Sequence, residues 1–231
     1  MDDLLVEITD LLEEIQIDFG GGCSVSKAYV IAYLIRRFNM KATLDIGVYR
    51  GRSLFPQAFV HKRYTGGIAY GIDPWSKEEA REYDNPRLKE KIDNFISDTD
   101  FEAIYNNVEK LKRKFELEHH CVVLRMNSEE AAKYFMEENI FFDLIHIDGN
   151  HDTAKVMKDI EVYLARLNSG GILVMDDISW ASVKPAYYKV SNRLPKIFQH
   201  IDAPWNDYAV FWNINSPLRL AWLRLMLKLS C

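Results

Sequence analysis

Short apolar runs alternate with longer segments of helical periodicity along this 231-residue chain. The runs that predict strands cover 42–47, 67–73, 121–126, 142–148 and 170–178. Strand–helix alternation of this kind indicates βαβ units, which build a mostly parallel sheet with helices on both faces. Two further β-rich runs, 197–203 and 208–214, predict an antiparallel pair at the end. We therefore predict an α/β fold: a doubly wound, Rossmann-like, seven-stranded, mostly parallel sheet with a C-terminal antiparallel hairpin.

The segments between the runs carry helical signals. Apolar positions at helical spacing predict helices over 2–17, through "KAYVIAYLIRRF", over 53–61, 128–138 and 153–167, and within the charged segment 76–118, which Asn85-Pro86 interrupts. Ser24 or Ser26 is the expected N-cap of the second helix. This order divides the chain into an N-terminal helical extension or lid (1–40), a main domain (41–215) and a C-terminal amphipathic helix (216–231).

Composition narrows the functional class. The formal net charge is −5, which disfavours a nucleic-acid surface, because phosphate binding needs clustered Lys and Arg. Cys23, Cys121 and Cys231 are far apart and show no metal or disulfide spacing, which suits a reducing compartment. No secretory signal opens the sequence and no apolar run reaches membrane-spanning length. We expect a cytoplasmic protein with a small-molecule partner, and a homo-oligomer is compatible with the sequence.

Polar residues gather at the predicted strand ends, where parallel sheets bind ligands. The first end, "LDIGVYRGRS", offers Asp45, Gly47, Gly51 and Ser53. Glycines there allow a ligand to approach the backbone, although a structural turn explains them equally well. A dinucleotide fingerprint would also need glycines at Tyr49 and Arg52, so a pyrophosphate cradle is missing.

The second and third strand ends supply further candidates. Asp73 follows the second strand, where a carboxylate can accept hydrogen bonds from both hydroxyls of a ribose, or simply cap a turn before Pro74. Asn127 and Ser128 follow the third strand and could address an adenine edge. Ser128 is equally suited to be an N-cap, and the two roles are compatible.

Together with these strand ends, the stretches "GIDPW", "FDLIHIDGNHD" and "GGILVMDDI" make residues 40–215 resemble the class I S-adenosylmethionine-dependent methyltransferases. Within that class they resemble the metal-dependent small-molecule O-methyltransferases, grouped with macrolide-sugar and catechol enzymes. The resemblance implies S-adenosyl-L-methionine as cofactor, with a hydroxylated sugar or natural product as acceptor. The residues it implies for the cofactor are Asp45, Gly47, Gly51, Ser53, Asp73, Asn127, Ser128 and Asp148.

Acidic residues end the fourth and fifth predicted strands. Asp148 and the pair Asp176-Asp177 would lie about one interstrand spacing, ~4.8 Å, apart. Unpaired carboxylates that close repel one another, and Mg²⁺ relieves this because it prefers oxygen ligands. The resemblance implies metal ligands at Asp148, Asp176 and Asp177. Asp177 stands where the catechol-type enzymes carry asparagine, so one acid could instead cap the turn before Trp180.

The motif "HIDGNHD" holds the candidate catalytic residues. Coordination to Mg²⁺ would lower the pKa of an acceptor hydroxyl, with Asp148 holding the metal and His151 accepting the proton. His151 could equally cap the following helix or orient a metal ligand. His146 shares the face of Asp148 and is expected to be a core or supporting residue, and Asp152 is the expected N-cap of the helix from 153.

Aromatic residues and the chain end leave alternatives open. Trp75, Trp180, Tyr187 and Tyr188 either line an acceptor pocket or pack in the core. The C-terminal segment is expected to pack on protein rather than lie on a membrane. Two other functions are considered: a metal-dependent hydroxylase-like relative, disfavoured because non-haem iron usually takes two histidines, and a non-catalytic cofactor-binding partner subunit.

Overall fold

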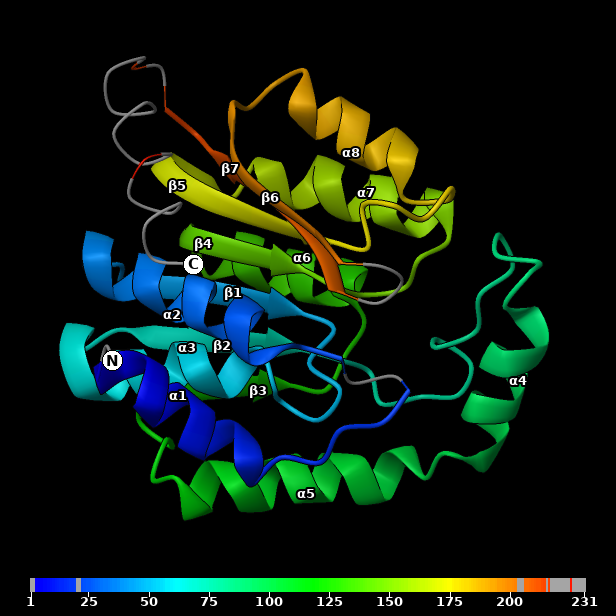
Figure 1. Cartoon of the computed structure of the whole chain (residues 1–231), viewed down its shortest axis with the longest axis horizontal. Coiled ribbons are helices and arrows are strands. Elements are labelled where there is room, and N and C mark those ends of the chain that lie inside the picture. The colour runs from blue at the N-terminus through cyan, green and yellow to red at the C-terminus, as the bar shows by residue number, and fades with distance from the viewer. Residues whose placement is uncertain (1–2, 20–21, 203–205, 215, 217–224, 226–231) are drawn as a thin grey trace.

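The computed structural model describes residues 3–19, 22–202, 206–214, 216 and 225. Its described strands form one seven-stranded sheet in the order β3-β2-β1-β4-β5-β7-β6 (Figure 1). They are β1 (Ala42–Ile46), β2 (Ile68–Ile72), β3 (Cys121–Leu124), β4 (Phe142–Ile147), β5 (Leu167–Asp176), β6 (Lys196–Asp202) and β7 (Asn206–Trp212). Strands β1 to β5 pair in parallel, and β7 runs antiparallel to both β5 and β6. The predicted fold class, hairpin included, is confirmed.

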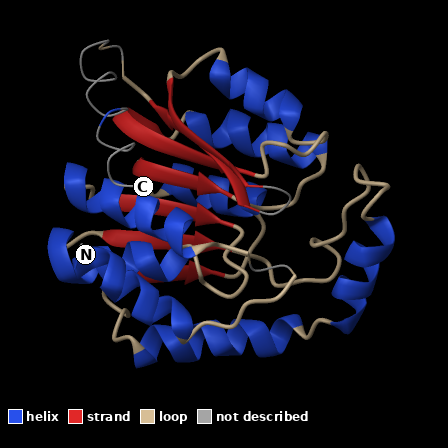
Figure 2. Ribbon diagram, in the orientation of Figure 1, coloured by secondary structure: helices blue, strands red, loops and turns tan. Residues whose placement is uncertain are grey.

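Helices cover both faces of this sheet (Figure 2). They are α1 (Asp3–Glu13), α2 (Val25–Phe38), α3 (Leu54–Val60), α4 (Lys89–Asp98), α5 (Phe101–Lys114), α6 (Ser128–Glu137), α7 (Thr153–Leu164) and α8 (Lys184–Ser191), with a π-helical turn, η1 (His61–Thr65), directly after α3. Of the two predicted candidates, Ser24 caps α2, by accepting the backbone N–H of Lys27. None of the described helices is long and apolar enough to cross a bilayer.

The alternation of side chains along the central strands builds two cores. Leu144, Val174 and Val210 face the cluster under α1, α2, α3 and α5. Ile145 and Met175, one position along, face the other cluster, under α6, α7 and α8. Strands that are buried on both faces read as continuous apolar runs, because every side chain meets a helix layer.

Several predicted boundaries differ from the structure, and the first helix, predicted over 2–17, ends at Glu13. The helical segment 76–118 contains two helices, and its first part, before α4, is a loop. Strand β5 begins at Leu167 rather than at 170, because Leu167 already pairs with Phe142 ahead of an irregularity in the β4–β5 register. Helix α7 therefore ends at Leu164, before the predicted end at 167.

The N-terminal helices are part of the core. Leu4 and Ile8 of α1 and Ile31 and Leu34 of α2 are fully buried within the first cluster. The division into a lid (1–40) and a main domain (41–215) stays a prediction. The predicted C-terminal helix (216–231) falls, apart from residues 216 and 225, outside the described residues.

Candidate active site

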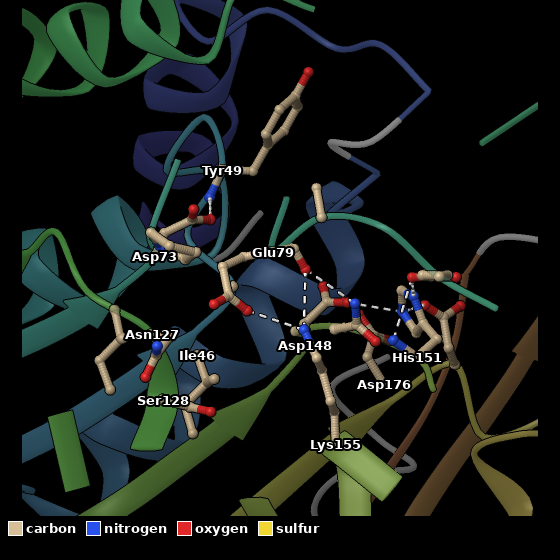
Figure 3. Close-up of a pocket in the computed structure, with 18 of the residues that line it drawn as sticks. Ile46, Tyr49, Asp73, Glu79, Asn127, Ser128, Asp148, His151, Lys155 and Asp176 are labelled. Carbon is tan, nitrogen blue, oxygen red and sulfur yellow. Dashed lines mark hydrogen bonds and ion pairs between the residues drawn. The ribbon is translucent and has the colours of Figure 1, made fainter. Parts of the chain in front are cut away.

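A cavity of about 270 Å³ opens at the carboxyl ends of the parallel strands. Strand order reverses between β1 and β4, and this switch point is where α/β sheets bind ligands. Of the predicted site residues, the cavity wall includes Gly47, Asp73, Asn127, Ser128, Asp148, His151, Asp176 and Asp177. Figure 3 shows Asp73, Asn127 and Ser128 toward one end, His151 and Asp176 toward the other, and Asp148 between them.

Gly47 lets the ends of β1 and β4 approach each other. Its φ is +91°, and a Cβ at this position would lie 1.9 Å from the carbonyl oxygen of Asp148. An L side chain would therefore meet both a clash with backbone and an unfavourable conformation. The backbone contact with Asp148 therefore requires glycine at position 47. Gly47 also lines the cavity.

Asp73 is fixed by the turns on either side of it. Its carboxylate accepts the backbone N–H of Tyr49 (2.8 Å) and that of Trp75 (2.7 Å). Burial raises the pKa of Asp73 to about 6, against the lowering effect of these two hydrogen bonds. Each carboxylate oxygen has a second acceptor position, so the side chain remains able to accept hydroxyl donors from the cavity.

Asn127 and Ser128 begin α6 beside Asp73. The N-cap is Asn127 and not Ser128: Asn127 Oδ1 accepts the backbone N–H of Glu130 (2.9 Å), and the Glu130 side chain returns to the N–H of Asn127. This reciprocal arrangement is a capping box, which satisfies two helix-end donors at once. Both residues still line the cavity.

The other predicted cofactor residues lie behind the wall. Asp45 is fully buried and accepts hydrogen bonds from Ser53 Oγ (2.7 Å) and His146 Nδ1 (2.6 Å). Gly51 has φ +87°, and a Cβ there would lie 2.5 Å from the Phe55 ring. Asp45, Gly51 and Ser53 are absent from the cavity lining among the described residues, so they hold its wall in place.

Lys27 reaches the site from α2. Its side chain is 2% exposed, its ammonium contacts Asp176 Oδ2, and it lies 3.4 Å from Asp148 Oδ2. Burial alone would lower the pKa of Lys27, but the charges of Asp176 and Asp148 outweigh it and hold the pKa well above its usual range. The ends of β4 and β5 are therefore bridged by a permanent positive charge.

This ammonium bears on the predicted magnesium site. Two groups of potential ligands occur among the described residues, and neither contains all three aspartates: His146, Asp148 and Asp176 form one, and Asp148, His151 and Asp177 the other. In the first, a divalent ion would sit beside Lys27. Unit charges 4 Å apart repel by about 4 kcal/mol at an effective dielectric of 20, so a double charge would be repelled by about 8 kcal/mol.

The second group presents a different obstacle. A metal-binding imidazole must be neutral, but His151 Nε2 lies 2.6 Å from Asp177 Oδ2 and its Nδ1 2.5 Å from Glu82 Oε1. Burial alone would lower the pKa of His151, but the charges of Asp177 and Glu82 outweigh it and hold the pKa well above its usual range. The three aspartates as arranged here do not fit one shared divalent cation.

His151 is held by the loop that precedes α4. Glu82 accepts from both the backbone N–H (3.2 Å) and the ring Nδ1 of His151. His151 Nε2 is close to Asp177 but has no aligned hydrogen-bond partner among the described residues. Glu82 therefore orients the ring through Nδ1, while Nε2 is buried beside Asp177. An imidazole oriented by a carboxylate at Nδ1 is the arrangement of a positioned acid–base histidine.

Asp152 fastens the same loop. It occupies the N-cap position of α7, as predicted, but its side chain makes no cap hydrogen bond. Its Oδ1 accepts instead the backbone N–H groups of Tyr83 (2.7 Å) and Asp84 (2.8 Å). The prediction of a capping side chain is wrong, because the carboxylate of Asp152 accepts two loop amides in place of the first amides of α7. These two hydrogen bonds hold the loop in the position where Glu82 contacts His151.

The aromatic candidates separate into one cavity residue and three others. Trp180 lines the cavity, with its ring centroid 4.5 Å from that of His151. Trp75 is buried and donates its ring N–H to the Tyr49 carbonyl (2.8 Å). Tyr187 packs against Phe211, and Tyr188 is largely exposed. Trp75 and Tyr187 therefore have packing roles.

Two important residues escaped the sequence patterns. Lys27 could have been found, because it lies in helical phase with the fully buried Ile31 and Leu34 and is the lone charge on that face of α2. Glu82 has no such signal, since it is one acid in a loop with many charges. The mutual arrangement of Lys27, Glu82 and the two strand ends depends on tertiary packing.

A family model described as a methyltransferase domain matches residues 44–178, more than half of the chain. The chain belongs to this methyltransferase family. The predicted methyltransferase class is thereby confirmed. No curated protein sequence matches this methyltransferase.

Solved structures of low sequence identity share the fold of this methyltransferase. An O-methyltransferase from Bacillus cereus in complex with SAH is 13% identical (TM-score 0.64, covering 92% of this chain and 91% of that one). TomG, an O-methyltransferase of tomaymycin synthesis from Streptomyces achromogenes in complex with SAM, is 11% identical (0.61, 92% and 90%). A putative caffeoyl-CoA O-methyltransferase from Staphylococcus aureus is 17% identical (0.55, 90% and 91%).

Proposed function

We propose that this protein transfers the methyl group of S-adenosyl-L-methionine to a hydroxyl of a small molecule, such as a sugar or another natural product. One observation carries the proposal: a single cavity joins Asp73 and the start of α6 to the charged pair Asp148 and His151. The methyltransferase family and the O-methyltransferases that share the fold support it. The buried free thiols of Cys23 and Cys121 are consistent with the cytoplasmic location that we include in the proposal.

The cofactor would lie across the ends of β1, β2 and β3. Asp73 would accept the two ribose hydroxyls, Asn127 and Ser128 would face the adenine, and Gly47 would leave space for the methionine part. Asp45, Gly51 and Ser53 would support this surface from behind. The methyl group would then point toward Asp148, at the centre of the cavity.

The acceptor would lie between Asp148, His151 and Trp180. Its hydroxyl proton would pass to Nε2 of the neutral form of His151, which becomes more abundant as pH rises, while Glu82 engages Nδ1. An oxygen lone pair would form the bond to the methyl carbon. The sulfur–methyl bond would break with its electron pair going to sulfur, leaving neutral S-adenosylhomocysteine and a protonated His151. Because the donor is already a reactive sulfonium, the protein supplies mainly orientation and proton transfer.

The predicted dependence on Mg²⁺ stays a prediction. When bound, such an ion would supply positive charge to the acceptor oxygen, but the contacts of Lys27 and His151 do not favour it. Turnover in EDTA against turnover with added Mg²⁺ tests this point. The hydroxylase-like alternative gains no support, because neither ligand group of the described residues holds two histidines.

Calorimetry with S-adenosylhomocysteine, followed by methyl transfer to a panel of hydroxylated sugars and phenols, tests the proposed function. We expect cofactor binding, and transfer to an oxygen acceptor detected as S-adenosylhomocysteine release. Absence of cofactor binding would overturn the proposal. Binding without transfer to any acceptor would favour the alternative of a non-catalytic partner subunit.

A further inference from the structure

The most unusual group at the site is a buried lysine from outside the strand ends. Lys27 lies in the first turn of α2, and its side chain is as inaccessible as those of the core residues around it. A buried ammonium is strongly unfavourable unless it is paired, and Lys27 is paired with Asp148 and Asp176. It also lines the cavity. Helix α2 therefore delivers a positive charge to the cavity floor.

The position of this charge is the one expected for a metal. Asp148 directly follows β4 and Asp176 ends β5, and a cation between those strand ends balances both carboxylates. An ammonium carries three N–H donors, and the two carboxylate contacts account for two of them. The third donor can address an oxygen that enters the cavity beside Asp148.

We propose that the Lys27 ammonium takes the place of a divalent cation and binds the acceptor oxygen directly, so that methyl transfer needs no metal. This inference rests on the proposed function and identifies a catalytic residue for it. The positive charge stabilises the oxygen as its proton leaves for His151. The substrate hydroxyl and the product ether are both neutral, so Lys27 stabilises the oxygen most as its proton leaves, and the charge favours the transition state over the ground state.

Mn²⁺ binding tests this inference independently of activity, because Mn²⁺ takes the same oxygen ligands as Mg²⁺. Binding is measured on the full chain by electron paramagnetic resonance for wild type, Lys27→Met, Lys27→Arg and the control Lys62→Met. Lys62 is also paired with a carboxylate, Glu116 (2.8 Å), but lies outside the cavity lining. Calorimetry with S-adenosylhomocysteine runs in parallel as a check of the cofactor site.

We expect wild type, Lys27→Arg and Lys62→Met to bind no Mn²⁺ at millimolar concentration. Lys27→Met should gain one Mn²⁺ site, because Asp148 and Asp176 lose their counter-charge, with a Kd at least about ten-fold below the highest Mn²⁺ concentration at which wild type shows no binding. Adding Asp148→Asn to Lys27→Met should abolish this site. Wild-type turnover should survive EDTA, and Lys27→Met should lose at least about a hundred-fold in kcat with cofactor affinity within about three-fold.

Stoichiometric Mn²⁺ binding to wild type that Asp148→Asn removes would overturn the inference, even if Lys27→Met fails to fold. So would a folded Lys27→Met that gains no Mn²⁺ site. Failure of wild type to bind S-adenosylhomocysteine would instead overturn the proposed function, so the two failures are distinguishable.

Discussion

Gly47 and Asp148 lie so close together that the ends of β1 and β4 touch through backbone alone: a Cβ on Gly47 would be 1.9 Å from the Asp148 carbonyl oxygen. The next residue along, Val48, is buried in the core, and Asp148 donates its backbone N–H to Ile46 (2.9 Å). The contact therefore fixes the floor of the cavity, between the cofactor end and the charged end.

Gly47→Ala should be among the most destabilising substitutions in this region. The methyl group meets backbone that cannot rotate away, and φ +91° adds strain. We expect a loss of at least about 3 kcal/mol in the free energy of unfolding, which corresponds to a fall in Tm of about 6–12 °C in a chain of this size. Thermal unfolding followed by circular dichroism measures it.

Gly170→Ala is the matched control for that substitution. Gly170 has a similar φ of +83°, but a Cβ there meets nothing within 4 Å. It should lose only the conformational part, about 1 kcal/mol. Equal losses for the two variants would show that close approach to Asp148 is not what requires glycine at 47.

Cofactor affinity should depend on pH through Asp73. The pKa of Asp73 is raised to about 6 by burial, and the charged form is the better acceptor for ribose hydroxyls. As pH falls from 7 to 5, the protonated fraction of this carboxyl group rises from about one-tenth to about nine-tenths, so the Kd for S-adenosylhomocysteine should rise by up to about ten-fold. Calorimetry at pH 5, 6, 7 and 8 measures this.

Asp73→Asn removes the titrating group while keeping the shape. Its Kd should be weaker than that of wild type at pH 7 and should be nearly constant between pH 5 and 8. If the variant keeps the wild-type pH dependence, another group is responsible, and the assignment of Asp73 to the ribose loses its support.

Proton transfer should depend on Glu82 through His151. Because the pKa of His151 is held well above its usual range, its neutral, proton-accepting form grows as pH rises, and kcat should rise toward alkaline pH. Glu82→Gln removes one of the two charges responsible, so the rising limb should move to lower pH. Loss of the positioned ring should also lower the maximal kcat by about 10- to 100-fold.

Glu78→Gln is the control for Glu82→Gln. Glu78 lies on the same loop, but it is exposed, bonds Ser76 and is absent from the cavity lining. Its pH–rate profile should match that of wild type. A Glu82→Gln profile that also matches wild type would remove Glu82 from the proposed proton transfer.

The fold could be predicted from the sequence because its signals are local. Strands such as β4, with five of its six side chains buried between helix layers, read as apolar runs, and glycines or acids mark their ends. The order of strands and helices then follows from the rules for βαβ units. The same logic brought Asp148 next to Asp176, since β4 and β5 pair in parallel.

The charge balance of the site could not be predicted in this way. Lys27 is 121 residues from Asp148 and 149 from Asp176 along the chain, and only the packing of α2 brings it between them. Glu82 contacts His151 because Asp152 binds the amides of the Glu82 loop and does not cap α7. Whether the clustered aspartates need a metal depends on contacts with residues far away in the sequence, such as Lys27. The periodicity of a local segment does not predict such contacts.

The buried pair of Asp45 and His146 should make stability depend on pH. Burial acts to lower the pKa of His146, but the nearby carboxylate of Asp176 (3.8 Å) and the hydrogen bond to Asp45 outweigh it and raise the pKa to about 9. A raised histidine pKa contributes stability that is complete below the unfolded value of about 6.5 and is lost as pH rises to about 9. The loss in the free energy of unfolding should approach about 3 kcal/mol between pH 6 and pH 9.5. Urea unfolding at these two pH values measures it.

His146→Gln removes the titrating group. It should be less stable than wild type at pH 6 and should lose much less free energy of unfolding between the two pH values. If it loses as much as wild type, the pH dependence arises from another group.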